Sequence, residues 1–95
     1  MAVPRRIQLR RAKGWRKPPG AVVVARPSKW GNPFPVAVYG RDEAIRRYRE
    51  YLLANQDLAA ACVELLAGRD LACWCAPGVA CHADVLLAVA NREGP

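Results

Sequence analysis

Two short apolar runs constrain the fold of this chain more than any other feature. Residues 21–25 read AVVVA and residues 71–75 read LACWC, and both patterns are typical of strands buried on both faces. Between them, apolar residues recur at the three- and four-residue spacing of helices. Because helical segments join the two strands, the connection predicts a crossover and a parallel pair.

The remaining elements follow from local patterns. Residues 6–10 alternate polar and apolar side chains, which indicates an exposed edge strand that most simply pairs antiparallel beside the 21–25 strand. Residues 36–39 form either a short strand or a segment pressed against the core. Helices are expected at residues 41–55, 57–67 and 82–92. Asp57 is the expected N-cap of the second helix.

These elements predict one α/β domain over residues 1–95, in the order strand, strand, helix, helix, strand, helix. We expect a small sandwich with a three- to four-stranded mixed sheet and about three helices. The ends, residues 1–5 and 92–95, are expected to fray. A homodimer is an attractive addition, because the core of a 95-residue chain is small.

Charge is spread unevenly along the chain. Residues 1–29 hold nine Lys and Arg and no acidic residue, so they supply the whole net charge of +7. This asymmetry indicates an anionic partner, either nucleic acid or a phosphorylated ligand, with a solvated basic face as the alternative. Trp15, which lies among cations in this part, could stack on a base or fold back over the core.

The chain carries no sign of a membrane segment. No apolar run approaches the ~20 residues that a membrane span needs, and the N-terminus lacks the apolar stretch of a secretory signal. We therefore expect no membrane partner. The cysteine spacing does not favour a disulfide framework, so a cytoplasmic protein with free or metal-bound thiols is the default.

The turn before the last helix concentrates reactive side chains. Cys73, Cys75, Cys81, His82 and Asp84 lie within twelve positions. A thiol at a helix N-terminus has a lowered pKa, so Cys81 with His82 could act as a nucleophile or a general acid/base pair. Asp84 could orient a base or hold a ribose hydroxyl, whereas its plainer role is to stabilise the helix start. The plainer role of His82 is that of a hydrogen-bonded residue at the head of the helix.

Zinc is the alternative interpretation of the same cluster. Thiolates and neutral imidazole are ligands that zinc favours, so Cys73, Cys75, Cys81 and His82 would close a structural site. Against this, a Cys-x-Cys pair followed by an adjacent Cys and His is not a standard zinc-finger spacing.

The loop at residues 26–34 is expected to face this turn. Both segments follow parallel strands, whose carboxyl ends lie at one edge of the sheet, and open α/β sheets bind ligands there. The candidate ligand-binding residues are Arg26, Ser28, Lys29, Trp30, Gly31 and Asn32. The first three offer donors to an anion, the tryptophan could stack on a base, the glycine permits close backbone approach, and the asparagine could read a base edge. Loop and helix start together predict a phosphate or nucleotide cradle, although no P-loop or dinucleotide fingerprint is present.

Two blocks carry a resemblance to a known family. PSKWGNPF at residues 27–34 and CWCAPGVACHADVL at residues 73–86 resemble the domain of unknown function 4326 family, small proteins of bacteria and their phages. The resemblance covers nearly the whole chain, and Ala83 stands where the family commonly has Gly. It marks Arg26, Ser28, Lys29, Trp30, Gly31, Asn32, Pro33, Phe34, Cys73, Trp74, Cys75, Pro77, Cys81, His82 and Asp84. It implies no particular activity, but it supports treating the loop and the turn as one site.

Three hypotheses for the function remain. The leading one is a domain that binds, and in the further case processes, a nucleotide-like or phosphorylated ligand where loop 26–34 meets turn 75–84. The first alternative is a zinc-stabilised basic module that binds nucleic acid. The second is a phage- or host-modulating domain that binds another protein. Whether the protein is an enzyme stays open at this point.

Overall fold

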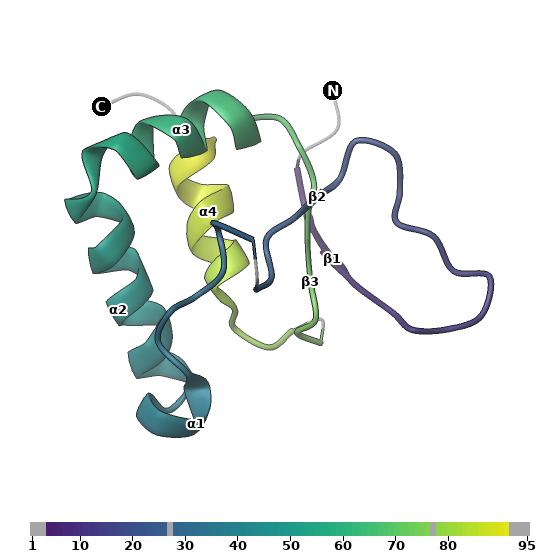
Figure 1. Ribbon diagram of the computed structural model, residues 1–95, viewed down its shortest axis with the longest axis horizontal. Coiled ribbons are helices and arrows are strands. Elements are labelled where there is room, and N and C mark those ends of the chain that lie inside the picture. The colour runs from purple at the N-terminus through teal and green to yellow at the C-terminus, as the bar shows by residue number, and fades with distance from the viewer. Residues whose placement is uncertain (1–3, 27, 77, 92–95) are drawn as a thin grey trace.

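The computed structural model describes residues 4–26, 28–76 and 78–91. Their elements, in chain order, are β1 (Arg6–Gln8), β2 (Val22–Val23), α1 (Val36–Tyr39), α2 (Arg41–Ala54), α3 (Gln56–Leu66), β3 (Leu71–Cys73) and α4 (His82–Ala90) (Figure 1). The α/β class is confirmed, and so is the predicted order of elements, with α1 as one additional short helix.

The three strands form one parallel sheet in the order β1-β3-β2. The predicted parallel pairing of β2 with β3 is confirmed. The predicted antiparallel pairing of β1 with β2 is wrong, because β1 pairs with β3 and runs parallel to it, so the sheet of the described residues is not mixed. The physical reason is the connection. Residues 9–21 form a link of thirteen residues, which is long enough to act as a crossover.

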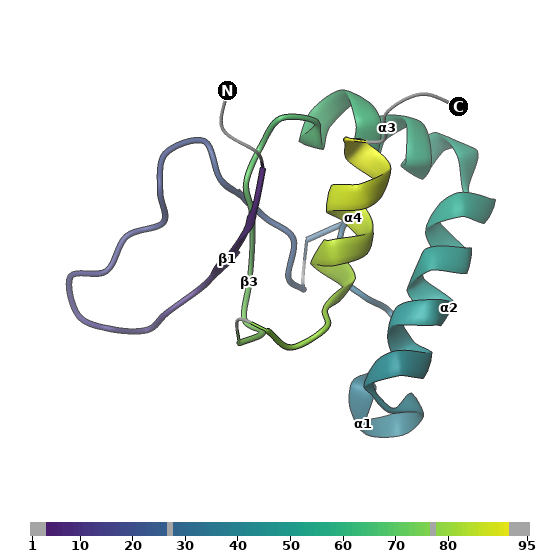
Figure 2. The same ribbon diagram turned by 180° about the vertical axis from the view of Figure 1, so that it is seen from behind.

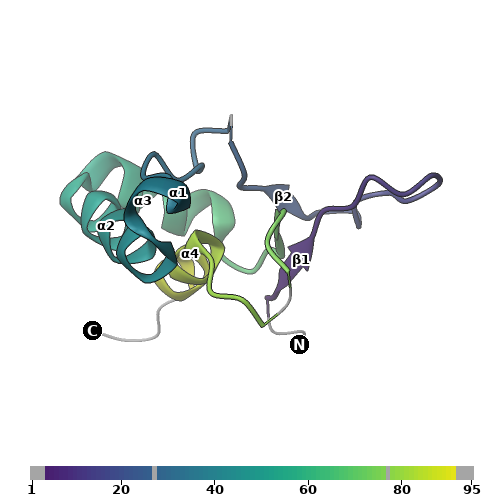
Figure 3. The same cartoon turned by 90° about the horizontal axis from the view of Figure 1, so that it is seen from below.

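The helices gather on one side of the sheet (Figures 2 and 3). Helix α4 packs against β1 and β3, while α2 and α3 pack against α4 and against each other. The largest fully buried side chains of the resulting core are Tyr48, Leu52, Leu66, Leu71 and Leu86. Cys62 is also fully buried, as expected for a core residue of α3. No helix among the described residues has the length and apolarity needed to cross a membrane.

Two local predictions differ from the structure. Residues 36–39 are the helix α1, and none of them is buried, so they neither form a strand nor press against the core. Gly40 follows with a φ of 80°, a left-handed conformation that favours glycine and lets the chain turn directly into α2. The N-cap of α3 is Asn55 and not Asp57, because the Asn55 side chain accepts a hydrogen bond from the backbone N–H of Leu58 at 3.2 Å.

Candidate functional site

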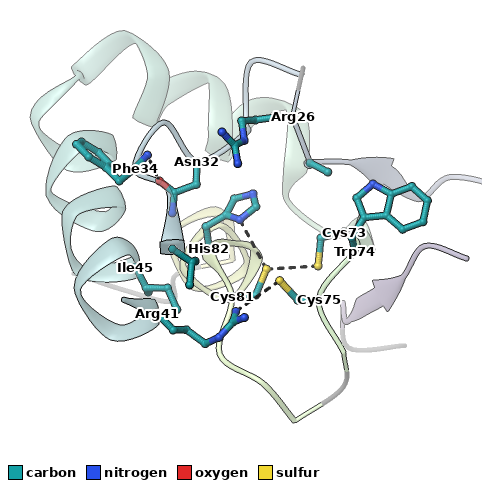
Figure 4. A pocket seen from close by; sticks show the side chains of 12 residues that line it. Arg26, Asn32, Phe34, Arg41, Ile45, Cys73, Trp74, Cys75, Cys81 and His82 are labelled. Atoms are coloured by element: carbon teal, nitrogen blue, oxygen red, sulfur yellow. Dashed lines mark hydrogen bonds between the residues drawn. The ribbon is translucent and has the colours of Figure 1, made fainter. Parts of the chain in front are cut away.

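A pocket of about 320 Å³ opens where the loop after β2 meets the turn after β3 (Figure 4). The structure therefore brings together the two segments whose meeting the parallel strands predicted. Helix α2 completes the wall. The lining residues are Ala25, Arg26, Asn32, Phe34, Val36, Arg41, Ile45, Cys73, Trp74, Cys75, Cys81 and His82.

Three thiols lie together at this pocket. The Sγ atoms of Cys73 and Cys81 are 3.4 Å apart, and the Sγ of Cys75 completes a group whose members all lie within 4.8 Å of one another. Cys73 and Cys81 are buried and Cys75 is half-buried. Cys73 is the last residue of β3, Cys75 lies in the bend that follows the strand, and Cys81 is the N-cap of α4. Three sulfur atoms this close could hold a metal ion.

His82 has a defined tautomer. Its Nε2 lies 2.8 Å from the carbonyl oxygen of Val24, and because a carbonyl can only accept, Nε2 must carry the hydrogen. In the neutral ring, Nδ1 then presents a lone pair, and Nδ1 lies 3.6 Å from the Sγ of Cys81. The ring of Tyr48 packs edge-on against the imidazole at 5.1 Å. The arrangement has the three parts of an activated nucleophile: a thiol, a base, and a group that orients the base.

The negative charge of the thiol group is concentrated on one sulfur. A hydrogen bond with Cys73 lowers the pKa of Cys81 far below its ordinary value, and hydrogen bonds with His82 and the backbone of Ala83 act in the same direction against the effect of burial. The same bond to Cys81 and then burial raise the pKa of Cys73. Burial and then the hydrogen bond to Cys81 raise the pKa of Cys75. At neutral pH, Cys81 is therefore the thiolate of the three.

Two arginines line the pocket from different elements. Arg26 is exposed in the loop after β2. Arg41, the first residue of α2, donates through Nη1 to the carbonyl oxygen of Ala80 at 2.8 Å and to the Sγ of Cys75 at 3.8 Å. Figure 4 shows the two guanidinium groups on either side of the Cys and His side chains. Arg41 was missed in the sequence because its contacts lie 34 and 39 residues further along the chain.

Of the six predicted ligand-binding residues, only Arg26 and Asn32 line the pocket. The Asn32 side chain is already engaged, since its Oδ1 accepts from the N–H of Phe34 at 2.8 Å and its Nδ2 donates to the carbonyl oxygen of Ala44 at 3.3 Å. Asn32 thereby ties the loop to α2. Its predicted role in reading a base edge would require these bonds to break.

The other four predicted residues do not line the pocket and instead contact other parts of the loop or the core. Trp30 is 4% exposed and lies in the core, so it is not placed to stack on a ligand, and its carbonyl oxygen accepts from the Tyr48 hydroxyl at 2.8 Å. The Nζ of Lys29 lies over the Trp30 ring at 5.0 Å. The Ser28 hydroxyl accepts from the N–H of Trp30 at 3.3 Å. A Cβ on Gly31 would lie 2.5 Å from Cγ of Arg26, so this glycine permits close approach of the chain to itself.

Asp84 lies outside the pocket. Its Oδ2 accepts from the backbone N–H of Cys81 at 3.1 Å and pairs with Nη1 of Arg6 at 3.1 Å. With the Cys81 side chain it forms a capping box at the start of α4. These contacts match the plainer role of stabilising the helix start, and among the described residues no hydrogen bond joins the Asp84 carboxylate to His82 or to Cys81 Sγ, with which a catalytic role was expected. Pro77, the remaining marked position of this turn, lies outside the described residues.

Comparison with known proteins identifies a family but no activity. No curated protein and no solved structure matches the chain. A family model described as Domain of unknown function (DUF4326) matches residues 7–92, which include every residue that lines the pocket. The chain belongs to the DUF4326 family.

Proposed function

We propose that the pocket binds a small anionic ligand that is nucleotide-like or phosphorylated. The observation that carries the proposal is the pairing of Arg26 and Arg41 around a pocket whose lining residues include no Asp or Glu. Among the described residues, neither arginine takes part in an ion pair, so both charges are available to a ligand. Guanidinium groups hold phosphate through paired hydrogen bonds.

The rest of the pocket suits a ligand with a flat apolar part. Phe34, Val36, Ile45 and Trp74 contribute apolar or aromatic surface beside the arginines. The volume of about 320 Å³ is within the range of pockets that take small molecules. An aromatic base joined to a phosphate combines the two chemistries that this lining offers.

The thiol group supports chemistry on the bound ligand. In this further case, Cys81 is the candidate nucleophile: its proton passes to Nδ1 of His82, which leaves a thiolate beside an imidazolium, while the Val24 carbonyl accepts the Nε2 hydrogen and holds the ring in position. Asp84 is left out of this proposal because its carboxylate is committed to Arg6 and the start of α4.

A thermal-shift experiment tests the binding proposal. Ligand at 100 times its Kd adds about 2.7 kcal/mol of stability, which raises the Tm of a domain of this size by roughly 10 °C or more. We expect a shift with nucleoside monophosphates and none with the matching nucleosides. Arg41→Gln and Arg26→Gln should each weaken binding by about tenfold or more.

Arg49→Gln is the matched control, because Arg49 is exposed on α2 and does not line this pocket. It should leave the affinity within about twofold. The proposal fails if a panel of nucleoside monophosphates, a pentose phosphate and inorganic phosphate produces no shift, or if the pocket variants bind as the control does.

Zinc at the thiols is a second candidate, and a specific distance favours it. Zinc–sulfur bonds of about 2.3 Å in a tetrahedron place sulfur atoms about 3.8 Å apart. The observed 3.4 Å between Cys73 and Cys81, with Cys75 inside the same 4.8 Å group, fits that spacing. His82 would be the fourth ligand through Nδ1, and its Nε2–H bond to a carbonyl is the outer contact that metal-bound histidines commonly make.

Elemental analysis of the purified protein tests this candidate. Zinc binding predicts about one metal per chain and loss of that metal in Cys73→Ser. Cys62→Ser is the control, because Cys62 lies in the core and bonds to the Leu86 carbonyl. A folded, metal-free protein that takes no zinc from a chromophoric chelator would exclude the metal role.

A further inference from the structure

The link between β1 and β2 forms a basic arm, which we define as residues 9–21. It extends away from the sheet and the helices (Figures 1 and 3). Five of its thirteen residues are cationic and none is acidic. These cations are Arg10, Arg11, Lys13, Arg16 and Lys17. All five are exposed, and none takes part in an ion pair among the described residues.

An arm of this kind contributes little to the fold. Ala21, at its end, is its one buried residue, and the rest of its thirteen residues form no helix or strand. Loops of this length without secondary structure are uncommon in compact domains, and binding loops are one of the classes in which they occur. Five like charges on one thin projection also repel each other. A polyanion that lies along the arm would relieve this repulsion and release counterions.

One residue of the basic arm contacts a residue that lines the pocket. The guanidinium carbon of Arg11 lies 5.0 Å from the centroid of the Trp74 ring. Trp74 lines the pocket, and 47% of its surface is exposed. Arg11 therefore connects the basic arm to an exposed aromatic ring of the pocket. Cations that follow a backbone and aromatic rings that stack on bases are the two features of single-strand binding surfaces.

We propose that the basic arm holds the backbone of a single-stranded nucleic acid and that one nucleotide of this strand occupies the pocket. The inference rests on the proposed function and names its substrate class: a nucleotide within a strand. A single strand fits better than a duplex, because a base inside a duplex cannot reach a concave site without first leaving its stack. Trp74 stacks on a base beside the pocket, and Arg11 holds the adjoining phosphate.

Fluorescence anisotropy with labelled twelve-nucleotide oligo(dT) and oligo(U) tests the proposal. The arm variant is Lys13→Gln/Arg16→Gln, and the control variant is Arg49→Gln/Arg69→Gln, which removes the same charge from exposed positions on the body. Each phosphate contact to a single strand contributes a salt slope of about −0.7, so two contacts account for about 25-fold in affinity at 0.1 M salt. We expect that loss in the arm variant and less than twofold in the control.

Further measurements tie the arm to the pocket. Trp74→Ala should weaken oligonucleotide binding by about tenfold through lost stacking. Arg41→Gln should weaken both oligonucleotide and mononucleotide binding, whereas the arm variant should keep the full mononucleotide thermal shift. That difference separates the two proposals. If no mononucleotide raises the Tm, the proposed ligand binding in the pocket is wrong. If the arm variant binds oligonucleotide as tightly as the control variant, the proposed role of the basic arm is wrong.

Several results would overturn the inference. Oligonucleotides that bind no tighter than mononucleotides would do so, as would equal binding by the arm and control variants. Inorganic polyphosphate that competes as well as oligonucleotide at equal charge would show that the arm senses charge alone. Tighter binding to vesicles with anionic lipid, or to a polyglutamate chain, would assign the arm to a different partner.

Discussion

Replacing Asp84 with alanine removes two interactions that hold the start of α4. The first is the hydrogen bond from the Cys81 N–H to Oδ2 at 3.1 Å, and the second is the ion pair with Arg6 at the same distance. The experiment decides between the structural role that the contacts indicate and the catalytic role that the sequence suggested.

The magnitude follows from the geometry. Loss of a cap costs about 1 kcal/mol, and loss of an acidic group in the first helical turn costs about 0.5 kcal/mol. The side chain of Asp84 is 52% exposed and that of Arg6 is 12% exposed, so their partly screened ion pair adds about 0.5 kcal/mol. Asp84→Ala should therefore lower the free energy of unfolding by about 2 kcal/mol, or the Tm by roughly 10 °C. Asp84→Asn keeps an acceptor for the Cys81 N–H and should cost about 1 kcal/mol.

Urea unfolding followed by far-UV circular dichroism measures these costs. Asp57→Ala is the control, because Asp57 lies in the first turn of α3 while Asn55 caps that helix, and it should cost less than about 0.5 kcal/mol. Arg6→Gln and the double variant with Asp84→Asn isolate the ion pair in a double-mutant cycle. A stable Asp84→Ala protein would refute the cap. An Asp84→Asn protein of native stability that no longer binds nucleotide would return Asp84 to the binding site.

Three further predictions concern the packing beneath the site. Tyr48→Phe should lower the free energy of unfolding by about 1–2 kcal/mol in urea, because the buried Trp30 carbonyl loses its donor; an unchanged midpoint would contradict this bond. Gly31→Ala should lower the free energy of unfolding by about 1–3 kcal/mol and weaken nucleotide binding, because the added Cβ meets the backbone and Cγ of Arg26. A native free energy of unfolding and native affinity would mean that the loop relaxes freely. Burial raises the pKa of Cys62 to about 11, so its thiol stays protonated at neutral pH, and mass spectrometry should find it alkylated only after unfolding. Rapid alkylation in the native state would contradict its burial.

The local pattern of the chain was sufficient for every strand and helix except α1, and for the meeting of the two loops. In the apolar run at residues 71–75, Leu71–Cys73 are buried as predicted, whereas Trp74 and, in the other run, Val23 are exposed. The helical segments between the two runs require a crossover, so β2 and β3 had to be parallel. Their carboxyl ends then lie at one edge, which places Arg26 and Cys81 at the same pocket. These inferences depend only on the period of the pattern and on chain connectivity, both of which can be read directly from the sequence.

Only the tertiary structure determined which strands pair and which side chains contact one another. The alternation at residues 6–10 suits an edge strand in either direction, and only the central place of β3 made β1 parallel to it. A tryptophan in a loop can face solvent or the core, and Trp30 is buried in the core, where its backbone carbonyl accepts from the Tyr48 hydroxyl. An acid at a helix start can serve the helix or a ligand, and Arg6 settles the position of Asp84. Local sequence sets which conformations a segment can adopt, whereas contacts between distant residues determine which groups a side chain reaches.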